Sequence, residues 1–287
     1  GTVTPYDFTL AAIPTGTLTG RVLETNTGLP LFATVIISGT PRTVHSDPAT
    51  GLYSVTLPVG DYTARVSSWS HRVVVQGGLT ITAGYSQTVD FALPPGPNVL
   101  LVDSGAWYND SHAAAYQADL EALGYSYATR SIRDPEKLPQ AAELTPYDIV
   151  VWSSPQDAPG LIGADVALRA YLNQGGRLLI SGQDIGYWDG GGNPFYYSAF
   201  FRDYLHARYL ADSASTSQLF GLPSEPFAGL TLTLNTLDSD RNQRFPDVVA
   251  AADDRGAAVL AYSGDGGAGL RAEVCLPYRV LYLSFGL

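Results

Sequence analysis

The hydrophobic pattern of the chain changes abruptly at residues 94–97, Pro-Pro-Gly-Pro. Over residues 16–93, short runs rich in Val, Thr, Tyr and Ile alternate apolar and polar side chains between turn-forming residues, which is typical of an antiparallel β-sandwich. After residue 97, strand-like runs alternate with helix-like runs, which predicts a mostly parallel sheet with helices on both faces. Because each proline fixes its own φ and lacks a backbone donor, we expect a stiff domain boundary here.

Charge is concentrated in the second part of the chain. The formal net charge is −11, and residues 1–96 carry only 4 basic and 5 acidic side chains, so nearly all the acidity lies beyond them. Such a surface repels phosphate and anionic lipid, and we expect no nucleic-acid partner. No run of about 18 apolar residues occurs, so we also expect no membrane span.

The single cysteine, Cys275, excludes an internal disulfide and a Cys-rich metal site. Its apolar neighbours predict a buried thiol in a strand.

The N-terminal residues indicate an excised piece of a longer protein. The chain has no methionine, and it begins within a strand-like pattern. Residues 6–10 (YDFTL), followed by Pro14, resemble residues 89–93 (VDFAL), followed by Pro94. We therefore expect residues 1–14 to be the end strand of a preceding module or an N-terminal extension. Chance similarity between two short strands is the alternative.

Residues 15–94 contain motifs that resemble a known sandwich family. These are GTLTGRV at 16–22, PLFATV at 30–35, TGLY at 50–53 and LPVGDY at 57–62. Together they resemble the carboxypeptidase regulatory-like, or prealbumin-like, seven-stranded module. The resemblance implies a secreted bacterial protein, extracellular or at the cell surface, rather than any activity. Related folds bind starch or other glycans.

Residues 97–287 are expected to form a second, α/β domain. Its strands are predicted at 98–103, 126–130, 147–152 and 177–181, and its helices at 111–123, 134–142 and 164–173, the last ended by Gly175-Gly176. An aromatic helix is predicted at 195–205. Further strands at 230–234, 257–262, 270–274 and 279–285 are expected to extend one edge of the sheet.

The order DIVVW at 148–152, a helix, and then GGRLLISG at 175–182 resembles the class I glutamine amidotransferase-like fold, including its trehalose-utilisation branch. The resemblance implies a flavodoxin-like doubly wound sheet. Active members place Cys in a G-x-C-x-G turn and a His with a Glu near the last strands. Here residues 182–186 place Asp184 at the Cys position, and residues 282–286 contain no His. A carboxylate is a poor nucleophile toward amides, so this chain is expected to lack amidotransferase activity.

The four histidines offer no replacement for the missing base. His45 and His71 precede the α/β domain, and His112 and His206 fall on predicted helices. We expect them to be surface histidines or core histidines with their own hydrogen-bond partners.

Modules of these two kinds resemble accessory regions of secreted subtilisin-like proteases, yet the chain holds no peptidase signature. We therefore predict a non-catalytic spacer or recognition region of a larger secreted or surface protein, itself expected to be a serine peptidase. Its expected partners are neighbouring domains of the same parent chain and a glycan or protein substrate.

Polar loops are expected to meet at the carboxyl ends of the parallel strands, where open α/β sheets bind ligands. A carbohydrate-binding unit using this crevice is the alternative function, because aromatic side chains there can stack on sugar rings. A third hypothesis is a hydrolase in which Asp184 and Asp189 act as a carboxylate pair. The alternative is that both aspartates are solvated or cap turns. The candidate residues are Asp103, Ser104, Trp107, Ser153, Ser154, Gln183, Asp184, Tyr187, Trp188 and Asp189.

We expect no cofactor apart from a calcium ion. The segment 238–242 has the D-x-D-x-N start of a calcium loop but lacks its glycine and distal glutamate. The candidate ligands are Asp238, Asp240 and Asn242.

Overall fold

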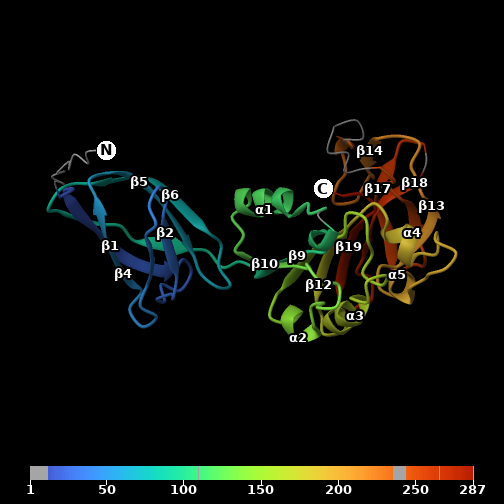
Figure 1. The fold of residues 1–287 in the computed structure, drawn as a ribbon, viewed down its shortest axis with the longest axis horizontal. Helices are drawn as coiled ribbons and strands as arrows, with labels where there is room; N and C mark the ends of the chain where they lie inside the picture. The colour runs from blue at the N-terminus through green and yellow to red at the C-terminus, as the bar shows by residue number, and fades with distance from the viewer. Residues whose placement is uncertain (1–11, 109, 235–243, 265, 287) are drawn as a thin grey trace, which may run out of the picture. The chain divides into compact units, whose positions relative to one another are not determined.

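The computed structural model describes residues 12–108, 110–234, 244–264 and 266–286. They form two compact units, one made of the described residues up to Gly96 together with Gly124–Ser126, the other of Pro97–Leu123 and the chain from Tyr127 onward (Figure 1). The predicted fold class, a β-sandwich followed by an α/β domain, is confirmed. The repeat-like strand at 6–10 and the candidate calcium ligands lie outside the described residues.

The first unit consists of two sheets whose alternating side chains meet in one core. Leu18, Val35 and Ile37 are completely buried there, as the period-two pattern predicts. One sheet has the order β4-β1-β7, with β8 also on β1, and the other has the order β3-β2-β5-β6. The strands are β1 (Thr15–Glu24), β2 (Thr34–Ile37), β3 (Thr43–His45), β4 (Leu52–Pro58), β5 (Gly60–Ser67), β6 (Val74–Ile81), β7 (Ser86–Thr88) and β8 (Phe91–Leu93).

β7 and β8 are one strand with an interruption. Both pair in parallel with β1, one after the other along its length. Between them, the Asp90 carboxylate replaces a backbone acceptor and receives the Arg21 N–H at 2.7 Å. Counted this way the sandwich has seven strands. Gly20 permits the close approach, because a Cβ atom there would overlap the carbonyl oxygen of Val89.

The second unit is built on one 11-stranded sheet. Its parallel half has the order β10-β9-β11-β12-β19. In chain order of the parallel strands this is 2-1-3-4-5, the flavodoxin-like arrangement. The strands of this half are β9 (Val99–Asp103), β10 (Tyr127–Ser131), β11 (Ile149–Ser153), β12 (Arg177–Ser181) and β19 (Arg279–Leu283).

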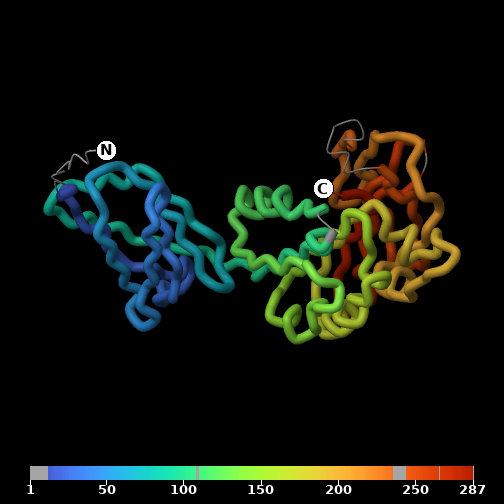
Figure 2. The backbone as a smooth tube through the Cα atoms, in the orientation of Figure 1, coloured from blue at the N-terminus to red at the C-terminus, as the bar shows by residue number. Residues whose placement is uncertain are grey.

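Antiparallel strands continue the sheet beyond β19, as predicted for this part of the chain. β19 itself does not extend an edge, however, because it pairs with β12 on one side and with β18 on the other. Figure 2 shows this last, red part of the chain beside the yellow-green segment of β12. The antiparallel strands are β13 (Ala207–Ala211), β14 (Gln218–Gly221), β15 (Thr231–Thr233), β16 (Val248–Ala251), β17 (Gly256–Tyr262) and β18 (Gly266–Ala272).

The helices of this unit are mostly short. The prediction of a helix at 134–142 is wrong over most of its length, because Pro135 and Pro139 interrupt it and the helix begins only at Ala141. The aromatic helix is shorter than predicted, since Ser198 caps it through the Phe200 N–H. The helices are η1 (Gly105–Tyr108), α1 (Ala113–Ala122), α2 (Ala141–Leu144), α3 (Asp165–Asn173), α4 (Ile185–Asp189) and α5 (Ala199–Asp203).

The end of α3 follows the prediction closely. Gly175 has φ +93 and donates its N–H to the Leu172 carbonyl at 2.9 Å, and the Gly176 N–H reaches the Tyr171 carbonyl at 3.2 Å. A left-handed glycine after the last helical residue satisfies carbonyls that the helix leaves unpaired. The chain therefore turns directly from α3 into β12.

No described helix has the length and apolar character needed to cross a membrane.

Replacing Gly20 by Ala tests the close approach of the interrupted edge strand to β1. The added methyl group would meet the Val89 carbonyl oxygen, so we expect a loss of about 1–3 kcal/mol, as for other overpacked sites. Differential scanning calorimetry of the full chain measures this as a lower unfolding temperature of the sandwich. Gly77→Ala is the matched control, because its new Cβ would lie 3.4 Å from Thr63 Oγ1. Equal unfolding temperatures for the two variants would contradict the interpretation.

Candidate functional site

The carboxyl ends of β9 and β11 mark the point where the strand order of the sheet reverses, and this is where such sheets bind ligands. The chain leaves β9 through Asp103 and Ser104, and it leaves β11 through Ser153 and Ser154. All four side chains are buried. The structure therefore brings these predicted residues together.

Ser104 is the centre of a hydrogen-bond network at this point. Its hydroxyl donates to the Ser153 carbonyl at 2.8 Å or to Asp157 Oδ1 at 2.8 Å, and it lies 3.1 Å from Ser154 Oγ. The Trp152 indole N–H donates to Ser154 Oγ at 2.9 Å. The hydroxyl groups of Ser104 and Ser154 are thus hydrogen-bonded to each other and to groups of β11 and the loop after it.

Asp157 completes this network from the loop after β11. It is 2% exposed, and burial raises its pKa to about 6 although hydrogen bonds from Ser104, Ser154 and Trp107 oppose the shift. Asp157 ends the polar loop that follows β11, residues 153–157. Nothing in the sequence distinguishes it as a buried hydrogen-bond acceptor.

Asp103 braces the start of α1. Its Oδ2 accepts the Ser111 hydroxyl at 2.7 Å, two residues before the helix begins. On the same helix, Tyr116 hydrogen-bonds to the Ser181 hydroxyl at the end of β12. α1 is therefore fixed over the carboxyl-end part of one sheet face.

Residues 182–186 form the turn between β12 and α4, without backbone strain at Asp184. Asp184 has φ −112, outside the left-handed region. A Cβ atom on Gly182 would overlap the Ser154 carbonyl oxygen, and one on Gly186 would lie 2.9 Å from Asp247 Oδ2. Both glycines are required because neighbouring chain segments approach closely.

Asp184 occupies the N-cap position of α4, yet its side chain makes no capping hydrogen bond. Burial raises its pKa to about 7, and the negative charges of Asp212 and Asp157 add to the shift. The carboxyl group therefore exchanges its proton near neutral pH. Such a group can hold or donate a proton, but it is a weak nucleophile when protonated.

Asp247 supplies the cap that Asp184 does not. It is completely buried, and its Oδ2 accepts the N–H groups of Gly186 at 2.7 Å and Tyr187 at 3.1 Å. Desolvation raises its pKa well above the usual value, and the nearby Asp184 contributes. Sequence reasoning missed this residue, since nothing near Pro246 indicates a partner 60 residues earlier in the chain.

Gln183 and Asp189, two other candidate residues of this turn and of α4, accept backbone N–H groups of other loops. Gln183 Oε1 accepts the N–H groups of Arg244 at 2.5 Å and Phe245 at 3.0 Å. Asp189, which is completely buried, accepts the N–H groups of Gly160 at 2.8 Å and Leu161 at 3.0 Å. Burial raises the pKa of Asp189 to about 7, against these two hydrogen bonds.

The aromatic candidates differ in exposure. Tyr187 and Trp188 form an edge-to-face pair with centroids 5.1 Å apart, and Trp188 packs against the main core. Trp107 is 39% exposed on η1. In the loop between α4 and α5, Phe195 is 94% exposed and Tyr197 is 50% exposed.

The prediction of a buried strand thiol at Cys275 is wrong. β18 ends at Ala272, and Cys275 lies exposed in the turn before β19 with φ +55. Because β12 and β19 are parallel, a residue that precedes β19 lies at the opposite strand ends from Asp184, which follows β12. Cys275 therefore cannot serve as a nucleophile in the 182–186 turn.

The histidines of this unit have partners of their own. His112 Nε2 lies 3.3 Å from Asp110 Oδ1. His206 is buried, with Nδ1 at 2.9 Å from Asp253 Oδ2 and Nε2 at 3.0 Å from the Tyr278 hydroxyl. Among the described residues, no group of three or more His, Cys, Asp and Glu side chains is arranged to hold a metal ion.

No family model and no curated protein matches the chain. Among solved structures, a protein from Bacteroides uniformis assigned as ThuA-like is 12% identical, with 66% of this chain and 81% of that chain covered and a TM-score of 0.44. A Thermoplasma acidophilum protein assigned as a GMP synthase component is 14% identical, with 66% and 82% covered and a TM-score of 0.43.

A smaller part of the chain is similar to β-sandwich proteins. A Bacteroides uniformis protein assigned as carbohydrate-binding is 19% identical, with 29% of this chain and 42% of that chain covered and a TM-score of 0.24. A cohesin–X-dockerin complex from Acetivibrio cellulolyticus gives 20% identity and a TM-score of 0.22, and this chain covers only 52% of the matched chain. Each of these likenesses covers only part of the chain, and none of them assigns an activity to it.

The raised pKa of Asp184 predicts how stability changes with pH. Its value of about 7 in the folded protein exceeds the unfolded value near 3.9, so its contribution is fully present below pH 3.9 and is lost as pH rises through about 7. Asp184→Asn keeps the neutral shape at every pH. We expect it to raise the unfolding temperature at pH 8 by roughly 2–4 °C, for a gain of about 1 kcal/mol, to have about a third of that effect at pH 5, and to have little effect at pH 4.

Thermal unfolding from pH 4 to 8 by circular dichroism measures this difference. Asp119→Asn, at an exposed position on α1, is the control and should follow the wild type at every pH. An Asp184→Asn variant that is less stable than the wild type at pH 8 would show that the carboxylate is stabilising, contrary to this assignment.

Proposed function

We propose that the chain is a non-catalytic recognition and spacer region of a larger secreted or surface protein. The observation that carries the proposal is the state of Asp184. At the turn where amidotransferase-like enzymes carry a nucleophile, this side chain makes no hydrogen bond with any described residue, and burial raises its pKa, which disfavours the ionised form. A nucleophile needs an adjacent base or a lowered pKa.

The surrounding side chains support the same proposal. Ser104 and Ser154 are hydrogen-bonded to each other and to neighbouring groups, and Gln183 and Asp189 hold backbone N–H groups of other loops. They rigidify the carboxyl edge of the sheet instead of facing a substrate. A scaffold with fixed loops suits recognition and spacing, for which geometry matters more than reactive groups.

The context of the parent protein extends this proposal. The motifs of the sandwich favour an extracellular or cell-surface position in a bacterial protein, and a subtilisin-like serine peptidase is the proposed parent. Neighbouring domains of that parent are the proposed partners, together with a glycan or protein substrate. The acidic net charge of −11 favours solubility and disfavours binding to anionic surfaces.

Turnover assays of the full chain test the absence of catalysis. We expect no release of ammonia from glutamine and no hydrolysis of p-nitrophenyl acetate or p-nitroanilides above the buffer rate, for the wild type and for Asp184→Ala alike. Turnover that is present in the wild type and lost in Asp184→Ala would overturn the proposal. Asp119→Ala serves as the control for a change of charge alone.

A carbohydrate-binding role is the second candidate, because exposed aromatic rings lie on loops of the α/β unit. Trp107, Phe195 and Tyr197 are 39%, 94% and 50% exposed, and such rings stack on sugars. If this role holds, a glycan array gives hits that Trp107→Ala weakens at least tenfold in calorimetry. Trp69→Ala, at a 55% exposed position in the sandwich, should bind as the wild type does. An array without hits would remove this candidate.

A further inference from the structure

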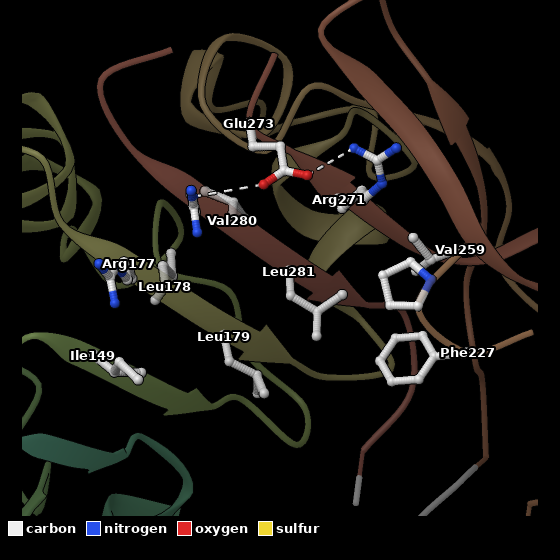
Figure 3. A pocket seen from close by; sticks show the side chains of 12 residues that line it. Ile149, Arg177, Leu178, Leu179, Phe227, Val259, Arg271, Glu273, Val280 and Leu281 are labelled. Atoms are coloured by element: carbon white, nitrogen blue, oxygen red, sulfur yellow. Dashed lines mark hydrogen bonds and ion pairs between the residues drawn. The ribbon is translucent and has the colours of Figure 1, made fainter. Parts of the chain in front are cut away.

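One face of the α/β sheet carries an apolar groove that no described helix covers over its middle strands. The face opposite to the main core presents Ile149, Leu179 and Leu281 in adjacent strands (Figure 3). At one end the lining meets Phe227 and the completely buried Val259, which belong to a further core cluster against which Leu281 also packs. The groove has a volume of about 270 Å³. Parallel strands usually have both faces covered, and here α1 contacts β9, hydrogen-bonds to Thr129 of β10 and reaches β12 at Ser181, its carboxyl end.

Arginines form one end of this groove. Arg177 and Arg279 are direct cross-strand neighbours at the starts of β12 and β19, and both are exposed. Arg279 shares the Glu273 carboxylate with Arg271, at 3.6 and 3.0 Å, as the dashed lines in Figure 3 show. The Arg177 guanidinium has no ion pair among the described residues. Like charges opposite each other destabilise a sheet, so this end of the groove favours an anionic partner although the chain is acidic.

The geometry of the groove favours a helix as its occupant. The lining strands are already paired on both sides within the sheet, so an extended peptide on their face would bury unpaired backbone groups. A helix satisfies its own backbone and presents an apolar stripe. The four strands from β11 to β18 span about 14 Å at roughly 4.8 Å per step, the length of a helix of about 10 residues.

We propose that this groove binds an acidic amphipathic helix of another protein, with apolar side chains on Leu179 and Leu281 and carboxylates on Arg177 and Arg279. This rests on the proposed recognition function and gives it a surface and a class of partner. A second copy of the chain is the competing occupant, and the sedimentation experiment below separates the two.

Fluorescence anisotropy with two synthetic helices tests the proposal. Both are fluorescein-labelled 14-residue peptides with leucines at i, i+3, i+4 and i+7, one with glutamates and one with lysines at the flanking positions. We expect the full chain to bind the glutamate peptide at least tenfold more tightly than the lysine peptide. This preference should shrink between 0.05 and 0.5 M salt, since salt screens exposed charges.

Variants of the chain locate the binding. The double variant Arg177→Gln and Arg279→Gln should weaken the glutamate peptide at least tenfold, and Leu179→Ala should weaken both peptides. Arg133→Gln, at an exposed position outside the groove, should change nothing, and circular dichroism checks that every variant is folded. Equal affinity for both peptides, or no effect of the double variant, would overturn the proposal.

Sedimentation velocity of the full chain decides about the second copy. Dimers that dissociate in the double arginine variant would assign the groove to self-association and overturn the partner helix. Turnover by the chain would refute the non-catalytic role without affecting the peptide result, so the two proposals fail separately.

Discussion

The position of β19 is the constraint on which the α/β unit depends. Its parallel pairing with β12 and its antiparallel pairing with β18 join the two halves of the sheet. Val280 and Tyr282 point from it into the main core, whereas Leu281 points to the opposite face. Because this strand comes almost 100 residues after β12, the sheet closes only when the whole intervening segment is in place, a non-local contact that is costly in chain entropy.

The turn after β12, residues 182–186, is held by contacts of its glycines and by Asp247, with Asp184 at its centre. Gly182 and Gly186 admit the β11 loop and the Asp247 carboxylate, and Asp247 caps α4 in place of Asp184. The cost of burying Asp184 is reduced because its raised pKa leaves the carboxyl group neutral below about pH 7. The N–H groups at the start of α4 are therefore satisfied by Asp247, which lies 60 residues further along the chain, and not by Asp184.

Much of this arrangement could be predicted from the sequence, and the exceptions have physical causes. The sandwich and the strands at 98–103 and 177–181 follow from local apolar patterns, which depend on a few neighbouring residues. The neighbours of β19 and the cap from Asp247 depend on contacts between segments far apart, which no local pattern encodes. The helix expected at 134–142 does not form over most of that range because Pro139 lacks a backbone N–H and its ring clashes with a preceding turn of helix.

The carboxyl and amino ends of the parallel strands differ in which side chains they present. At the carboxyl edge, where this architecture places its ligands, buried groups such as Ser104, Asp157 and Asp189 are engaged with one another or with backbone N–H groups. Toward the amino ends, β12 and β19 carry two neighbouring exposed arginines beside the half-buried Leu179 and Leu281. In the proposed function, the hydrogen bonds at the carboxyl ends of the strands hold the loops in place, and the uncovered face provides a surface for association. The proposed recognition surface therefore lies on a face of the sheet and not at the carboxyl ends of its strands.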